Sequence, residues 1–270
     1  MTCSHNRCST SEHHTEAARQ EPQRLARRVA TLVPCSRTEA ERYIAGGWVR
    51  VDGQVVDRPE ARVRDHQQVS IDPAATAEPL PLATVLWHKP AGVAVPDALH
   101  LPTGLALQWF DAPHRCAAEH KLGALPRAQL HRLQPLLPLT IDAAGLMVLT
   151  QHPAISRRLT EGVRDLEQEW LVDLPATREP ASDDARAAWL AAAQRARTEE
   201  ARRHPPLRVS WQSDTRLRIA AKGWTAQALA RHLAAADVPL GQLRRQRIGR
   251  VGLSGLAVGQ WRQLGMGERF

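Results

Sequence analysis

The stretch SRTEAERYIAGGWVRVDGQVV (residues 36–56) predicts a helix followed directly by a tight β-hairpin. Ser36 and Glu39 have the spacing of a capping box, in which each side chain bonds the other residue's backbone N–H, so a helix should begin here. The Gly-Gly pair ends this helix, because glycine readily adopts the backbone conformation found after a helix. The Asp-Gly pair between two β-branched runs is the strongest short-range signal for a hairpin.

The residues on either side extend this pattern to a small α+β module. RLARRVATL (24–32) repeats apolar residues at helical spacing, and QVSI (68–71) reads as a further strand. We therefore predict two short helices followed by a small sheet, in a domain of residues 22–72.

Arginines are clustered on or beside the two predicted helices of this module. One interpretation is a solvated helix face, which Glu39 and Glu41 partly balance. The other is a surface that grips phosphates, because the planar guanidinium fork fits their oxygens. We predict phosphate contacts for Arg27, Arg28, Arg37 and Arg42.

The whole composition favours a polyanionic partner. The chain has 270 residues, 43% of them hydrophobic, and a formal net charge of +8, with a pI near 10.3. No apolar run approaches the roughly 18 residues of a membrane span, and the first twenty residues lack the apolar segment of a secretory leader. We expect a cytoplasmic protein with no membrane partner, beginning with a disordered tail at residues 1–21.

Metal binding is not expected. The four cysteines lack the paired C-x-x-C spacing of zinc sites. A site within the tail is conceivable, but the tail is predicted to be disordered. Its residues would be Cys3, Cys8, His13 and His14.

The remainder of the chain predicts a second, larger domain. Residues 73–83 are rich in Pro and Ala, which is typical of a linker. Strand patterns then alternate with helical runs, including residues 183–203 and a helix capped by Thr225. The predicted class is α+β, a small module followed by a mixed, mainly antiparallel α/β domain at 84–270. The segment 97–135 shows no clear periodicity.

Two resemblances sharpen this prediction. The stretch quoted at the outset resembles the S4-like RNA-binding domain. After it, HKPAG, GLMVLTQ, EQEWLV and PLGQLRRQRIG occur in the order found in ribosomal RNA pseudouridine synthases with an N-terminal S4-like domain. The chain is similar to that family over residues 24–264.

The resemblance implies an enzyme that detaches uracil from its ribose and rejoins it through carbon 5. Such enzymes need no metal and no cofactor, and the target nucleotide must leave its stack to reach the pocket. The implied partner is structured RNA, specifically ribosomal RNA, and we expect a monomer.

The sequence departs from the family at the catalytic aspartate. The family pattern G-R-L-D-x-x-[ST]-x-G-L, anchored without a gap on Gly145, places Thr140 at the aspartate position. Asp142 lies two residues downstream, about 6–7 Å away along an extended segment. Asp142 is therefore the fallback catalyst, and it is otherwise an ordinary turn residue.

The other pocket motifs depart as well. The resemblance places Trp170 at the position of a tyrosine that stacks on the base, and Leu229 at the position of the aspartate's basic partner. Trp170 has a competing interpretation as a core residue. Gln227 matches the family's glutamine, and Lys89 lies in the HKPAG motif. We predict that these four residues border the substrate site.

Strand alternation in QLRRQRIG predicts which arginines of the large domain face RNA. It places Arg245 and Arg247 on one face and Arg244 on the other. We expect Arg245 and Arg247 to contact RNA.

Three functions remain open. The first is an RNA-binding uridine isomerase that uses Asp142. The second is a family member without catalysis, acting as a structured-RNA binder or in ribosome assembly. The third, non-specific binding of nucleic acid, fits the ordered motifs poorly.

Overall fold

A computed structural model describes residues 21–78, 81–122, 125–175, 177 and 182–270. The predicted tail, apart from residue 21, lies outside these residues, and so does the conceivable metal site within it. The chain divides into two compact units, the first with residues 21–44 and 48–77, the second with 45–47 and 78–270. Within the described residues, no helix combines the length and apolar character needed to cross a bilayer.

The first unit contains the two helices and the small sheet that the sequence predicted. Buried apolar residues of both helices, among them Val29 and Ile44, pack against Val49 of the sheet. The strand order is β3-β2-β5, and a separate short pairing joins β1 and β4. The elements are β1 (Gln23–Arg24), α1 (Leu25–Leu32), α2 (Arg37–Ala45), β2 (Val49–Val51), β3 (Gln54–Val55), β4 (Arg62–Val63) and β5 (Val69–Ile71).

The capping box and the hairpin predicted for this unit are both formed in the structure. The Ser36 N–H donates to Glu39 Oε2 at 2.7 Å, and the Glu39 N–H donates to Ser36 Oγ at 3.2 Å, which completes the capping box. Asp52 and the glycine after it have φ values of 50° and 78°, as a two-residue hairpin loop requires. The Asp52 carboxylate also accepts bonds from Gln67 Nε2 and the Gln68 N–H, both at 2.8 Å. These bonds tie the hairpin to β5 and hold the pKa of Asp52 below its usual value.

The second unit is organised around one large mixed sheet. Its strand order is β10-β11-β9-β12-β8-β6-β14, with β13 paired to β12 and β7 to β8. Within the described residues β8 and β12 run parallel, and the other neighbouring strands are antiparallel. The strands are β6 (Thr84–Lys89), β7 (Gln134–Leu136), β8 (Ala144–Thr150), β9 (Glu167–Asp173), β10 (Arg208–Ser213), β11 (Arg216–Lys222), β12 (Gln242–Ile248), β13 (Val251–Gly252) and β14 (Trp261–Gln263).

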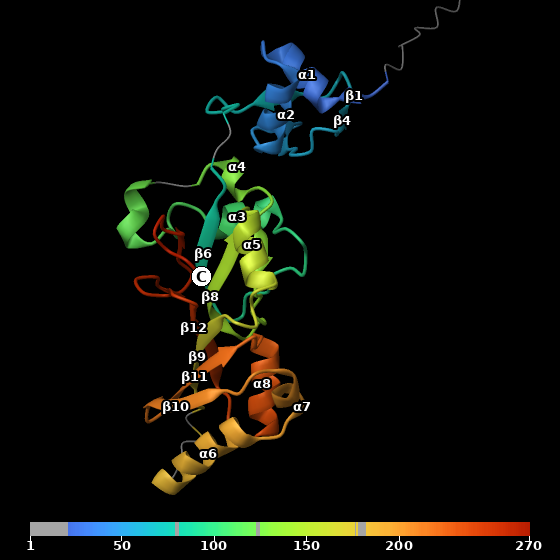
Figure 1. Ribbon diagram of the computed structural model, residues 1–270. Helices are drawn as coiled ribbons and strands as arrows, with labels where there is room; N and C mark the ends of the chain where they lie inside the picture. The colour runs from blue at the N-terminus through green and yellow to red at the C-terminus, as the bar shows by residue number, and fades with distance from the viewer. Residues whose placement is uncertain (1–20, 79–80, 123–124, 176, 178–181) are drawn as a thin grey trace, which may run out of the picture. The chain divides into compact units, whose positions relative to one another are not determined.

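Helices cover this sheet at both ends. Figure 1 shows α7 and α8 beside β9 and β11, and α3 and α5 beside β6 and β8. Along β8, Leu146 packs with Leu159 of α5, whereas Met147 packs with Ala106 of α3, so both faces of this strand are buried. The helices are α3 (Thr103–Trp109), the 3-10 helix η1 (Ala117–Leu122), α4 (Arg127–Leu130), α5 (Pro153–Thr160), α6 (Asp183–Arg195), α7 (Glu199–Arg203) and α8 (Ala226–Ala235).

The structure corrects the prediction of one continuous helix over residues 183–203. The run is divided into α6 and α7, and the Thr198 hydroxyl accepts a bond from the Ala201 N–H at the start of α7. A threonine in this position caps a new helix rather than continuing the preceding one. The segment 97–135, which shows no clear periodicity, contains α3, η1 and α4.

The structure also corrects the predicted faces of β12. The pairing with β9 shifts between Arg245, opposite Trp170, and Arg247, opposite Glu169. Such a bulge inserts one extra residue and breaks simple alternation. Because neighbouring residues of β9 point to opposite faces, Arg245 and Arg247 lie on opposite faces, and Arg247 shares a face with Arg244.

Candidate functional site

Four segments that are distant in sequence line one cavity of 510 Å³ in the second unit. They are the loop before β8, the end of α5 and the turn after it, the start of α8, and the middle of β12. We call this space the Thr140 cavity. Its lining residues are Leu137, Pro138, Leu139, Thr140, Leu159, Thr160, Val163, Trp224, Thr225, Gln227 and Arg245.

Two residues placed by the family motifs, Thr140 and Gln227, lie together in this cavity. Thr140 comes from the loop before β8. Gln227 comes from the first turn of α8, where the Thr225 hydroxyl accepts a bond from the Ala228 N–H and fixes the helix start. Any nucleotide that both residues contact would therefore lie in this cavity.

Asp142 is an exposed residue beside this loop and is not among the residues that line the Thr140 cavity. Its negative charge acts instead on Lys89, whose pKa it raises in part. A catalytic role for Asp142 thus stays a prediction, and it requires the loop to change conformation.

Lys89 is fully buried and holds the loop before β8 in place. Its Nζ donates to the carbonyl oxygens of Pro90, Ile141 and Ala143, at 2.9, 3.2 and 2.8 Å. Burial lowers the pKa of Lys89 to about 8, and Asp142 opposes this shift. The contacts of Lys89 are those of a positioning residue, one step removed from the cavity.

Arg245 provides the charge of the cavity. Its side chain is 1% exposed, and Nε, Nη1 and Nη2 donate to the Leu146 carbonyl, Gln168 Oε1 and the Leu137 carbonyl at 2.8, 3.3 and 2.6 Å. All three acceptors are neutral. Burial lowers the pKa of Arg245 to about 9, which leaves the guanidinium charged at neutral pH.

Gly145 makes this arrangement possible. A Cβ atom at this position would lie 2.3 Å from the backbone oxygen of Arg245, and the φ of Gly145 is 113°. Only glycine allows β8 and β12 to approach so closely here. The close approach brings the Arg245 guanidinium to the Leu146 carbonyl and the edge of the cavity.

Trp170 and Leu229 are both in the core, each with 0% exposure. Arg245 lies over the indole ring of Trp170, with 5.2 Å between its Cζ and the ring centroid. The indole N–H has no hydrogen-bond partner among the described residues. Trp170 therefore presents no open face to a base in this conformation, and its stacking role stays a prediction that requires Arg245 to move.

Arg247 lies on the opposite face of the sheet, in a network of ion pairs. It contacts Glu167 at 2.9 Å and Glu169 at 3.3 Å. Arg208 pairs with Glu167 as well, and Arg218 pairs with Glu169 at 2.6 Å. These cations lower the pKa of both glutamates. The predicted RNA contact of Arg247 would compete with these carboxylates.

In the first unit, three arginines surround a hollow of 360 Å³ on α1 and α2. Arg24, Arg27 and Arg37 line it. Arg42 lies apart and donates to the Ala77 carbonyl at 3.5 Å, and Arg28 is half-buried. The hollow thus brings together two of the four predicted RNA-binding residues and adds Arg24.

Two features beside the Thr140 cavity were not predicted from the sequence. They are the buried position of Gln168 and the inward direction of the Arg245 side chain. Gln168 is fully buried, accepts from Arg245 and donates to the Trp224 carbonyl at 3.2 Å. A polar residue within an apolar strand was the available signal for Gln168. For Arg245, the bulge removed the alternation on which its face was predicted.

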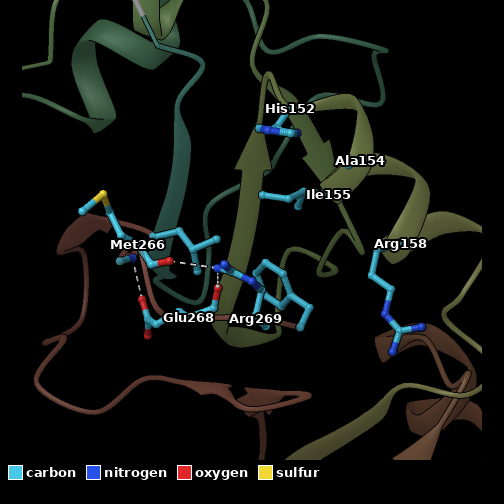
Figure 2. Close-up of a pocket in the computed structure, with 10 residues that line it drawn as sticks. His152, Ala154, Ile155, Arg158, Met266, Glu268 and Arg269 are labelled. Atoms are coloured by element: carbon cyan, nitrogen blue, oxygen red, sulfur yellow. Dashed lines mark hydrogen bonds between the residues drawn. The ribbon is translucent and has the colours of Figure 1, made fainter.

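A second cavity of the large unit, 460 Å³, lies between α5 and the C-terminal residues. Figure 2 shows Ile155 and Arg158 of α5 at this cavity, with Arg269 bonded to the backbone of Met266 and Glu268. These two hydrogen bonds hold residues 266–269 in a compact turn. Among the described residues, no group of three or more His, Cys, Asp or Glu side chains could hold a metal ion.

Comparisons with known proteins agree with both resemblances. Residues 23–69 match the S4 domain family. Ribosomal small subunit pseudouridine synthase A of Pseudomonas aeruginosa is 34% identical over 139 residues. This match covers 51% of the present chain and 53% of the relative, so it spans about half the length of that relative. The protein of the same name from Salmonella typhimurium is 28% identical over 243 residues, covering 89% of this chain and 96% of the relative. A crystal structure of a pseudouridylate synthase aligns with 90% of this chain and 96% of its own, with 21% identity and a TM-score of 0.48.

Proposed function

We propose that the chain is a member of the ribosomal RNA pseudouridine synthases that carry an S4 domain, and that it binds structured ribosomal RNA and holds one nucleotide in the Thr140 cavity without isomerising it. In this proposal the S4 domain grips the phosphate backbone and the large unit receives the nucleotide. The cytoplasmic location and the monomeric state expected from the sequence belong to the same proposal.

One observation carries the proposal. Thr140, at the position where the family has its aspartate, lines the cavity, and none of the described lining residues is Asp or Glu. A threonine hydroxyl stays protonated at neutral pH, so without a base it is a weak nucleophile. The described lining residues therefore supply no carboxylate to attack the sugar.

The basic residue of the family's reaction has been replaced as well. Leu229 stands at that position and is fully buried in the core. A lone carboxylate or a lone cation facing an apolar interior would carry a cost of several kcal/mol. The loss of both charges is therefore one coherent change, which supports a binding role over a catalytic one.

RNA binding itself is supported by the S4 domain and its hollow. Arg24, Arg27 and Arg37 converge there, and guanidinium groups are suited to bidentate contacts with phosphate oxygens. Double-stranded RNA is recognised mainly through shape and backbone contacts, which agrees with a basic surface on a small rigid module.

A second function is an active uridine isomerase in which Asp142 moves into the cavity. The names of the relatives favour it, since they are pseudouridine synthases. The exposed position of Asp142 opposes it.

Crosslinking in cells tests the proposal. Tagged full-length protein is crosslinked to RNA and the bound segments are sequenced, while pseudouridines are mapped in the same RNA from cells with and without the chain. We expect reproducible crosslinks to ribosomal RNA and no pseudouridine that depends on the chain. Crosslinks without preference for ribosomal RNA would refute the binding proposal, and a chain-dependent pseudouridine would establish the isomerase.

A further inference from the structure

The second cavity of the large unit is an apolar groove between the first turns of α5 and residues 264–270, with a volume of 460 Å³. Figure 2 shows Ile155 of α5 on one side of this space and Met266 on the other. We call it the C-terminal groove. Ile155, Leu264 and Phe270 are only partly buried and pack against the core beneath them. The groove is therefore a place where the apolar core of the sheet reaches the surface.

Met266 stands at the edge of the C-terminal groove on a turn that is held in place. It is 97% exposed, the largest value among the exposed large hydrophobic residues of the described part of the chain. Arg269 Nη1 donates to its carbonyl oxygen at 2.9 Å, and the Gly265 N–H donates to Glu268 Oε2 at 2.7 Å. Because Met266 adjoins other apolar side chains, it belongs to a patch, unlike the isolated apolar residues common on protein surfaces. The flexible thioether side chain of methionine adapts well to apolar partners.

The unpaired side-chain charge at the C-terminal groove is positive. Glu268 is the one side-chain carboxylate among the described lining residues, and Arg262 neutralises it through bonds of 2.6 and 2.8 Å. Arg158 and Arg269 line the groove, are exposed, and form no salt bridge with a described residue. His152 adds a further positive charge when it is protonated. The groove thus presents cations to a ligand without a competing free side-chain carboxylate.

We propose that the C-terminal groove binds an acidic segment of a partner protein. Large apolar side chains of the segment pack against Ile155, Leu264 and Met266, and its carboxylates lie beside Arg158 and Arg269. Apolar anchors inserted into a pocket supply most of the affinity of such contacts, and complementary charges supply specificity and a faster association.

The lining of the groove favours a peptide over RNA. Single-stranded RNA is recognised by hydrogen bonds to base edges and by stacking on aromatic rings. Phe270 is the one aromatic residue among the described lining residues, and it packs partly against the core. The C-terminal groove shares no described lining residue with the Thr140 cavity, so this inference does not depend on the proposed function.

Selection from a phage-displayed library of random peptides, with the full-length chain as the immobilised target, tests the proposal. We expect the enriched peptides to combine acidic residues with large apolar ones. Each is then synthesised with a fluorescent label, and its affinity for the chain is measured by fluorescence polarisation. Enrichment of no peptide, or of peptides without net negative charge, would overturn the proposal.

Met266→Glu tests whether the selected peptides occupy the C-terminal groove. It places a carboxylate among the apolar contacts and should weaken peptide binding at least about tenfold. The turn should persist, because it is held through the backbone of Met266. Val258→Glu is the matched control, since it makes the same kind of change at another exposed apolar residue, outside the groove, and should leave the affinity unchanged. Equal affinities of the two variants would refute the groove as the binding site.

Arg158→Glu tests the charge complementarity. The reversal should weaken binding of the acidic peptides by about threefold to tenfold at low ionic strength, and this loss should shrink in high salt because exposed charges are screened. Arg157→Glu is the control, because Arg157 is exposed on the same helix but does not line the groove. If both reversals have the same effect, the peptides respond only to the overall charge of the chain and the proposed carboxylate contacts are wrong.

Two other occupants would give different results. If ribosomal RNA displaces the selected peptides and binds Met266→Glu more weakly than Val258→Glu, RNA occupies the groove and the proposal fails. If light scattering shows an oligomer that Met266→Glu dissociates and Val258→Glu does not, the groove joins copies of this chain and the proposal fails as well. We expect both variants to have the same mass in solution and the same affinity for ribosomal RNA.

Discussion

The guanidinium of Arg245 lies 5.2 Å above the ring of Trp170, and both side chains are almost completely buried. Arg245 covers the aromatic face on which a base would stack. The residue that the motif resemblance assigns to base stacking is thus part of the core, and the cation above it is one of the residues that line the cavity.

Replacing Trp170 should affect stability rather than affinity. Trp170→Ala should cost about 3–5 kcal/mol in the free energy of unfolding, because it leaves a large void in the core. RNA affinity, measured under conditions where the variant is folded, should be unchanged. Trp211→Ala is the control, since Arg186 lies over its ring in a similar way but Trp211 is only half-buried. A loss of affinity in folded Trp170→Ala would show that the ring contacts RNA.

Gly145→Ala should disrupt the junction of β8 and β12. The added Cβ would meet the Arg245 backbone oxygen at 2.3 Å, in a backbone conformation unfavourable for alanine. The combined strain and overpacking should cost roughly 3 kcal/mol or more. Gly104→Ala in α3 has open space around its Cβ and should be neutral or stabilising by up to about 1 kcal/mol. Chemical denaturation of both variants measures the difference, and equal stabilities would contradict the close approach.

The S4 domain should bind phosphates through the hollow on α1 and α2. Replacing Arg24, Arg27 and Arg37 together with Ala should reduce the log–log salt dependence of RNA binding by roughly three units, about one for each phosphate contact. Arg58→Ala removes an exposed arginine of the same unit outside the hollow and should have a smaller effect. An unchanged slope in the triple variant would mean that the three arginines form only a solvated surface.

Lys89 should give the stability a distinctive pH dependence. Its pKa is about 8 in the folded chain, against 10.5 for an unperturbed lysine. Between these values the unfolded chain holds more protons, so raising the pH stabilises the fold. The difference in unfolding free energy between the natural chain and Lys89→Met should be constant below pH 8 and should shift in favour of the natural chain from about pH 8 to 10.5. Urea denaturation at a series of pH values measures it, and a flat difference would show that Lys89 is not desolvated.

Much of the fold could be predicted because its signals are local. The capping box of Ser36 and Glu39 and the hairpin at Asp52 each depend on residues within a few positions of one another. The break between α6 and α7 had a local signal too, Thr198, but helical spacing across the whole run concealed it.

The site was less predictable because its geometry depends on pairing between distant segments. Thr140 and Gln227, which the motif spacing singled out, both line one cavity, and their role there stays a prediction. The inward position of Arg245 depends on a bulge against β9 and on the close approach at Gly145, and neither can be read from alternation within β12. The exposed position of Asp142 likewise follows from the tether that Lys89 provides to Ile141 and Ala143.

Tritium release from ribosomal RNA labelled at carbon 5 of uridine tests the central claim most directly, because isomerisation at that carbon releases the label. The purified full-length chain and its Asp142→Asn variant are incubated with small-subunit and large-subunit RNA at matched concentrations. We predict no release above background by either protein, while both retain RNA binding. Release by the natural chain that is abolished by Asp142→Asn would contradict this account and identify Asp142 as the catalyst.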